Sequence, residues 1–216
     1  MKYSLLTLFT FFLLVFGIQI RGVSQTVEIT PTYGYQFGSK LNYNGGYFKL
    51  NDGNEFGITV GFNTYKGLLA ELTYIRHESD LRFRDVVFSP NETNVSNINF
   101  DWIMVGASQY FKTGRVKPYA GGALGVVIIT PQDQNFGDTN IYLDTNTKFA
   151  FSFKAGVKIM LTEVLGLNLQ GNLMFPVDWG GYYVGVGPGG VGGGASVNST
   201  TLIGGFSGGL VFAFGD

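Results

Sequence analysis

The chain has 216 residues, including 33 Gly, 20 Phe, no Cys and one His, and only 13% of its residues are charged. This composition is too apolar for a disordered chain and too rich in glycine for a helical one. Without cysteine there is no disulfide framework or thiol nucleophile, and one histidine excludes a histidine-rich metal site. The length suits one domain, or at most two small ones.

The first 24 residues have the pattern of a secretory signal peptide. Lys2 is followed by an apolar run over residues 5–18, and small residues at 22–24 precede Gln25. An N-terminal membrane anchor is the alternative, but the run is shorter than the roughly 20 residues that a spanning helix needs. Cleavage before Gln25 would leave 12 basic and 15 acidic residues, a net charge of −3. This charge, with no basic tract, argues against nucleic acid as a partner.

After the signal, apolar and polar residues alternate in eight segments, as in β-strands with one apolar face. In the fourth segment the alternation predicts Trp102 on the apolar face and Asp101 on the polar face. The fifth segment is apolar on both faces, so the sequence leaves its sides unassigned. The eight segments are residues 27–37, 55–63, 68–80, 97–112, 116–130, 148–161, 165–175 and 202–214.

Two all-β architectures fit this alternation. A soluble β-sandwich would bury the apolar face, whereas a membrane barrel would turn it to lipid and keep polar and small residues inside. The connections favour the barrel, because long and short ones alternate, as expected when one end carries tight periplasmic turns. We predict an eight-stranded antiparallel up-and-down transmembrane β-barrel over residues 25–216. The long connections are residues 38–53, 81–96, 131–147 and 176–199, and the short ones lie near 65–67, 112–116 and 162–164.

Two motifs resemble a known family. The run WIMVGASQYF at residues 102–111, a short basic turn and the run KPYAGGALG at residues 117–125 resemble the middle of small outer-membrane β-barrel proteins, the OmpA/OmpX-like barrels of Gram-negative bacteria. A mature start at Gln25 resembles exported proteins of Bacteroidetes. The resemblance implies an outer-membrane location, and we expect no cofactor. The sequence leaves no room for a periplasmic domain after Phe214, so we expect a barrel alone.

The alternation also predicts which charged residues lie inside the barrel. An eight-stranded barrel is just wide enough for side chains to fill it, so charges inside must pair or be solvated. A plug of interior salt bridges is the favoured interpretation, and a gate or narrow ion path is the alternative. The predicted interior charges are Glu28, Glu55, Glu71, Asp101, Lys148, Lys154 and Lys158.

No residue is assigned a catalytic, cofactor-binding or metal-ligating role. His77 and Ser79 have the spacing of the histidine and serine of barrel enzymes that deacylate lipid A, and a histidine can activate a serine. However, they share the parity of Glu71 and would face the interior, so a solvated strand end near the outer rim is preferred. Three acids of one loop could ligate a hard cation but lack ordered spacing. These acids are Asp133, Asp138 and Asp144.

The last long connection is unusual, since nine of the fifteen residues at 180–194 are Gly. Such a tract is expected to be mobile, either as a surface loop that contacts a partner through Tyr182 and Tyr183 or as a plain spacer.

The predicted function is that of a non-enzymatic outer-membrane protein with a structural or surface-interaction role through four external loops. A narrow porin-like channel or transporter is the alternative, and a soluble secreted β-domain is a more distant one. The expected partners are the lipid bilayer of the outer membrane, with its lipopolysaccharide, and an extracellular ligand or protein at the loops. We expect a monomer.

Overall fold

The computed structural model describes residues 26–43, 45–86, 89–132, 144–177, 181–187, 190–196 and 202–215. No helix among them is long and apolar enough to cross a membrane. The elements are β1 (Val27–Gln36), β2 (Ser39–Tyr43), β3 (Gly46–Leu50), β4 (Gly53–Asn63), the 3-10 turn η1 (Tyr65–Gly67), β5 (Leu68–Asp85), β6 (Ser89–Tyr110), β7 (Val116–Gln132), β8 (Asn146–Met160), β9 (Leu165–Val177), β10 (Gly181–Gly187), β11 (Gly190–Ser196) and β12 (Ile203–Phe214).

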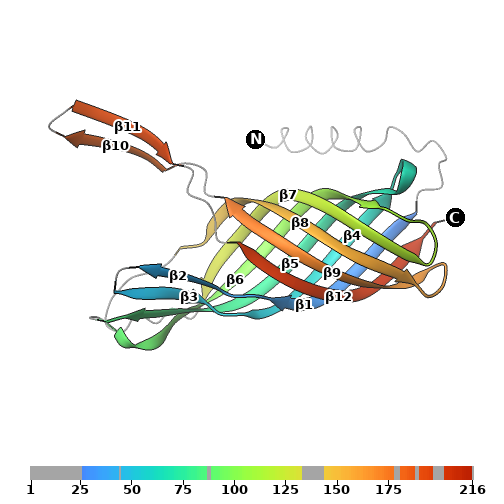
Figure 1. Ribbon diagram of the computed structural model, residues 1–216, viewed down its shortest axis with the longest axis horizontal. Coiled ribbons are helices and arrows are strands. Elements are labelled where there is room, and N and C mark those ends of the chain that lie inside the picture. Colours follow the sequence, from blue (N-terminus) through green and yellow to red (C-terminus); the bar gives the residue numbers. More distant parts are fainter. Residues whose placement is uncertain are drawn as a thin grey trace, which may run out of the picture.

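Eight of these strands close into an antiparallel barrel, which confirms the predicted fold (Figure 1). The order around the wall is β1, β4, β5, β6, β7, β8, β9 and β12, so each barrel strand pairs with the next one along the chain. The barrel closes where Val27 of β1 pairs with Phe214 of β12.

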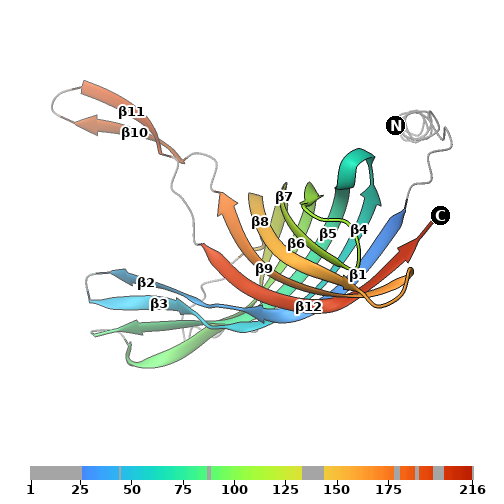
Figure 2. The same ribbon diagram turned by 45° about the vertical axis from the view of Figure 1, so that its right-hand side comes forward.

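The strand register fixes the tilt and width of the barrel. Cross-strand pairs followed once around the wall from Val27 lead through Phe62, Ala107 and Leu173 back to the chain at Phe37, ten residues further along. For eight strands this stagger corresponds to a tilt of about 40° from the barrel axis. The tilt is visible in Figure 2. The interior is therefore narrow enough for side chains to fill.

The outer face of the wall is apolar, as predicted. On β1, β4, β5, β8, β9 and β12 the predicted apolar faces point outward, and the structure also resolves β7, where Tyr119 and Val127 point inward and Leu124 outward. An outward apolar belt around a polar interior is the pattern of a membrane barrel. Exposed members of the belt include Phe56, Leu72, Val105, Leu124, Phe153, Leu169, Phe206 and Leu210.

Three short turns lie at the end of the barrel where β1 begins and β12 ends (right in Figure 1). In the first turn Lys66 (φ 62°) and Gly67 (φ 77°) are left-handed, and in the second Gly114 has a φ of 108°. Left-handed residues allow such tight reversals of the chain. These turns coincide with the predicted short connections, and tight turns of this kind are typical of the periplasmic end of a membrane barrel.

At the opposite end, two segments predicted as loops are strands. β5 runs on to Asp85 and β6 starts at Ser89, while β3 pairs with the end of β5 and β2 pairs with β3. We call this sheet the rim extension (lower left in Figures 1 and 2). It consists of β2, β3, residues 81–85 at the end of β5 and residues 89–97 at the start of β6. The strands can continue beyond the apolar belt because pairing satisfies their backbone N–H and C=O groups there, as it does in the barrel wall.

The glycine-rich segment also departs from the predicted loop. The backbones of β10 and β11 form a two-stranded antiparallel sheet in which Gly181 pairs with Ser196. The sequence between β9 and β12 therefore includes paired strands, although the predicted tyrosine contacts at 182 and 183 lie outside the described side chains.

Candidate functional site: the barrel interior and its rim

Near the end of the barrel that carries the short turns, a buried ion pair crosses the interior. Lys158 Nζ of β8 lies 2.6 Å from Glu28 Oε2 of β1, and the Tyr110 hydroxyl donates to the same oxygen at 2.6 Å. Glu28 and Lys158 are 2% and 3% exposed. The Lys158 amine also lies 5.3 Å from the centre of the Tyr110 ring, a cation–π distance. Two opposite charges and a phenol therefore form one connected group.

A second ion pair stands beside the first. Lys154 Nζ lies 2.7 Å from Glu71 Oε2, and the Ser108 hydroxyl donates to that oxygen at 2.7 Å. Acids on β1 and β5 thus meet lysines on β8, as the alternation predicted. A buried charge is tolerated when it has both an opposite charge and a hydrogen bond. Glu28, Glu71, Lys154 and Lys158 meet this condition.

Glu55 is the third interior acid, and its partners are amides. Gln36 Nε2 donates to it at 2.7 Å and Asn172 Nδ2 at 3.2 Å. Within the described part of the chain, no lysine or arginine lies within ion-pair distance of Glu55. The carbonyl oxygens of Gln36 and Asn172 are buried without a hydrogen-bond partner there. This layer is polar but has no counter-ion.

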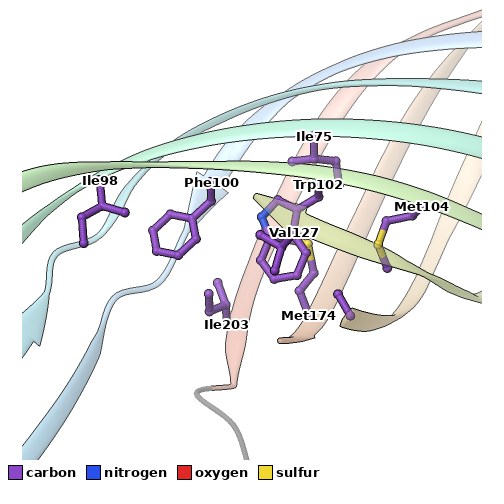
Figure 3. Close-up of a cluster of buried hydrophobic side chains, with 9 residues drawn as sticks. Ile75, Ile98, Phe100, Trp102, Met104, Val127, Met174 and Ile203 are labelled. Atoms are coloured by element: carbon purple, nitrogen blue, oxygen red, sulfur yellow. The ribbon is translucent and has the colours of Figure 1, made fainter. Parts of the chain in front are cut away.

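Towards the rim, an apolar cluster occupies the interior (Figure 3). Trp102, Val127 and Met174 are 0% exposed and come from three different strands, so their side chains meet across the lumen. The cluster comprises Ile75, Ile98, Phe100, Trp102, Met104, Val127, Ala150, Met174 and Ile203.

The prediction for the two faces of β6 was wrong. Trp102 points into the barrel, while Asp101 lies on the outer face, where it accepts a hydrogen bond from the Tyr74 hydroxyl at 2.6 Å. Arg76 NH1 is 3.7 Å from the same carboxylate. Both faces of this strand carry apolar residues, and its outward polar residues lie above the apolar belt. The interior therefore holds two paired acids and Glu55, but not Asp101.

His77 and Ser79 do face inward, as their parity predicted, but they are buried rather than solvated. They are 1% and 6% exposed. The Ser79 hydroxyl donates to the Asn51 carbonyl, and His77 Nδ1 lies 3.2 Å from the Asn54 carbonyl. Ser79 therefore contacts the backbone just before β4, and His77 contacts the backbone at the start of β4. Neither of these hydrogen bonds joins the two side chains to each other.

The remaining predicted residues are less central. Lys148 lies half-buried on β8, Asp144 is exposed, and Asp133 and Asp138 lie outside the described residues. Among described residues, no group of three or more His, Cys, Asp or Glu could hold a metal ion. Sequence reasoning missed Tyr110 and Tyr119, although Tyr119 bonds Asn168 at 2.8 Å inside the barrel. The sequence held no clear signal for either, because the even positions of the fourth segment were assigned to the outer face and the fifth segment was left unassigned.

Residues 12–175 match the family model described as outer membrane protein beta-barrel domain. Among solved structures, Neisserial surface protein A is similar, with 16% identity, a TM-score of 0.56, and coverage of 88% of this chain and 97% of that one. Ail, the attachment invasion locus protein of Yersinia pestis solved with the heparin analogue sucrose octasulfate, has 12% identity and a TM-score of 0.52, with coverage of 89% and 100%. No functionally curated protein matches the chain. At these identities the structural likenesses concern the fold alone.

Proposed function

Because the chain belongs to the outer-membrane β-barrel family, we propose that it is a closed, non-enzymatic barrel that carries an interaction surface on the outside of the cell. The observation behind this is the interior, which is occupied at two levels. Paired charges lie towards the periplasmic end, and the apolar cluster around Trp102 lies towards the rim. Ions avoid an apolar constriction, because it cannot replace their hydration.

The surface role is supported by the rim extension. A sheet beyond the apolar belt is formed by β2, β3 and the ends of β5 and β6. A barrel that served only to conduct would not need this sheet. The neighbour Ail is named for attachment and invasion, and a surface role of that general kind is the one we propose here.

Single-channel conductance of the refolded protein in a planar bilayer tests the closed interior. We expect no steady openings from the wild-type barrel. A Trp102→Ala, Met174→Ala double variant removes bulk from two fully buried positions of the cluster, so we expect it to open intermittently. Steady, reproducible wild-type openings would instead support the alternative function, a narrow channel, with Glu71 and Lys154 as the first residues to substitute.

The non-enzymatic part of the proposal rests on His77. Because its side chain is buried in the interior and contacts the Asn54 carbonyl, an acyl chain in the membrane would not reach it. We expect a His77→Ala variant to leave lipid A acylation unchanged, as measured by mass spectrometry of extracted lipid A. A change in acyl number that depends on His77 would contradict this.

We further propose that residues 1–24 are a signal peptide and that the mature chain starts at Gln25. The apolar run after Lys2 supports this. The mass of the protein purified from outer membranes gives the start of the chain directly, and a retained Lys2 would overturn the proposal.

A further inference from the structure

The rim extension places three cations in one row. Lys40 of β2 pairs directly with Lys49 of β3, and Lys49 pairs with Arg82 of β5. Directly opposite residues of neighbouring strands share a face of the sheet, so the three side chains stand next to one another. Like charges in such positions destabilise a sheet. An arrangement of this kind calls for an anion to offset it.

The row lies on the outer side of the extension. Leu50 and Leu81, the sequence neighbours of Lys49 and Arg82, pack against the interior apolar cluster. Successive side chains of a strand point to opposite faces, so the cations point away from the barrel axis. They continue the same outward face on which Leu72 of β5 meets the surroundings of the wall.

The lysine end of the row lies close to the headgroup layer of the outer leaflet. Phe37 follows directly after β1, and its side chain is 51% exposed. It is the last apolar residue on the outward face of that strand. Lys40 follows three residues later, which at about 3.3 Å per residue and a tilt of about 40° is a rise of about 8 Å. The polar layer of a bilayer begins at the hydrocarbon edge and is about 5–8 Å deep. Lys40 therefore stands at the outer edge of the headgroup layer, and Lys49 lies next to it in the row.

The carboxylates near the row are already engaged. Glu92 accepts hydrogen bonds from Tyr47 at 2.6 Å and from Arg82 at 3.0 Å. Asp52 accepts from the Tyr35 hydroxyl at 2.7 Å and from the Gly38 amide at 2.9 Å.

The two lysines, by contrast, keep their charge available. The Lys40 amine lies 3.8 Å from the centre of the Tyr47 ring, and Lys49 influences Asp52 and Glu92 only through space. Neither lysine has an ion pair with any described residue. On this face, Lys40 and Lys49 are therefore the cations that have no ion pair with a described residue.

We propose that Lys40 and Lys49 bind phosphate groups of outer-leaflet lipids, with one phosphate bridging the two lysines across β2 and β3. The proposal rests on the proposed function, because it requires the barrel to span the outer membrane with this face outside. It names lipid phosphate as the partner of the surface that the barrel carries. A phosphate offers acceptor oxygens to several donors at once and offsets the repulsion within the row.

The test measures binding of bisphosphorylated lipid A to the full refolded barrel in neutral detergent micelles, by calorimetry. We expect Lys40→Gln, Lys49→Gln to weaken binding roughly ten- to thirtyfold, since each basic residue near a membrane surface contributes a factor of about five. The matched variant Lys40→Arg, Lys49→Arg keeps the charge and should keep the affinity. Equal binding by the Gln variant and the wild type would overturn the proposal.

Two further measurements distinguish lipid phosphate from a purely structural role of the lysines and from a soluble polyanion. In neutral phosphatidylcholine vesicles, the Gln variant should unfold at the same or a higher urea concentration than wild type, because the repulsion between the two lysines is removed. A lower urea midpoint of unfolding would mean that the lysines have a structural role and would overturn the proposal. Soluble inositol hexakisphosphate should compete weakly with lipid A; binding of it in preference to lipid A would assign the row to a soluble polyanion instead. Failure of any of these leaves the conductance result, and so the closed barrel, untouched.

Discussion

Glu28 and Glu55 lie inside the same barrel, each 2% exposed, but in different electrostatic environments. Glu28 has the Lys158 amine at 2.6 Å, whereas Glu55 has only amide donors from Gln36 and Asn172. Removing one partner of a buried ion pair leaves the other charge without compensation, which is costly. Removing a buried charge that has no counter-ion carries no such penalty.

The two acids should therefore respond differently to the same substitution. We expect Glu28→Gln to lower the free energy of unfolding by about 3–5 kcal/mol, because Lys158 stays buried without its partner. Glu55→Gln should cost less than about 1 kcal/mol or stabilise the barrel, because the new amide can donate to the unpartnered carbonyls of Gln36 or Asn172. Urea unfolding in detergent micelles gives both values. Equal losses for the two variants would contradict this difference between the acids.

On the rim, the Tyr47 hydroxyl and the Arg82 guanidinium hold the pKa of Glu92 below its usual range. A lowered folded-state pKa means that this link stabilises the rim extension at pH values above the unfolded pKa, near 4.5, and is lost as the pH falls through the folded value. We expect amide protection in β3 to be constant from pH 7 to 5 and to fall below about pH 4.5. Hydrogen exchange across this range measures it, and a Glu92→Gln variant should lose the pH dependence.

Apart from Asp101, the sequence predicted which acids face inward and that lysines of β8 would meet them, but not which residues pair. Alternation gives the side of a strand, whereas the meeting of Glu28 with Lys158 across 130 residues depends on the stagger of the strands. That stagger, ten residues around the barrel, follows from all eight registers together. Tyr110, which bonds Glu28, could not be placed for the same reason.

At the scale of elements, β6 shows where alternation alone is insufficient. Its outward residues change from apolar Ile103 to polar Asp101 along one face, because the strand leaves the apolar belt there. Its inward residues change the other way, since the interior near the rim is filled by Trp102 and its neighbours. A single strand thus has opposite polarity patterns in its two halves. The same exit from lipid explains why β5 and β6 continue where loops were predicted.

Close backbone approach between β6 and β7 gives a prediction at this scale. A Cβ atom on Gly125 would overlap the carbonyl oxygen of Ile103, whereas one on Gly171 would meet its nearest neighbour, the Gly205 carbonyl oxygen, at 3.8 Å. We expect Gly125→Ala to destabilise the barrel by about 1–3 kcal/mol, since strand backbones must shift. The matched Gly171→Ala should change the free energy of unfolding by less than about 0.5 kcal/mol. A greater loss at Gly171 would contradict the register.

For the whole molecule, the stagger and the apolar belt together determine how the barrel sits in a bilayer. Val105 lies on the outer face, about half exposed, between Leu72 and Leu124. It is four residues from Asp101, where β6 leaves the apolar belt, and five from Tyr110, where β6 ends at a short turn, so it lies near the middle of the belt. Val116 begins β7 next to a periplasmic turn and is also half exposed, at 52%. The two valines therefore have similar exposure but different depth.

This difference in depth separates a membrane barrel from a soluble β-domain. An arginine on the lipid face costs about 2–4 kcal/mol at the bilayer midplane and about 0–1 kcal/mol near the interfaces. We expect Val105→Arg to lower the unfolding free energy in phosphatidylcholine vesicles by the larger amount and Val116→Arg by the smaller. In a soluble domain both side chains would face water, and neither substitution would cost more than a few tenths of a kcal/mol. Equal, small changes in the unfolding free energy of the two variants in vesicles would therefore show that this barrel does not span the membrane.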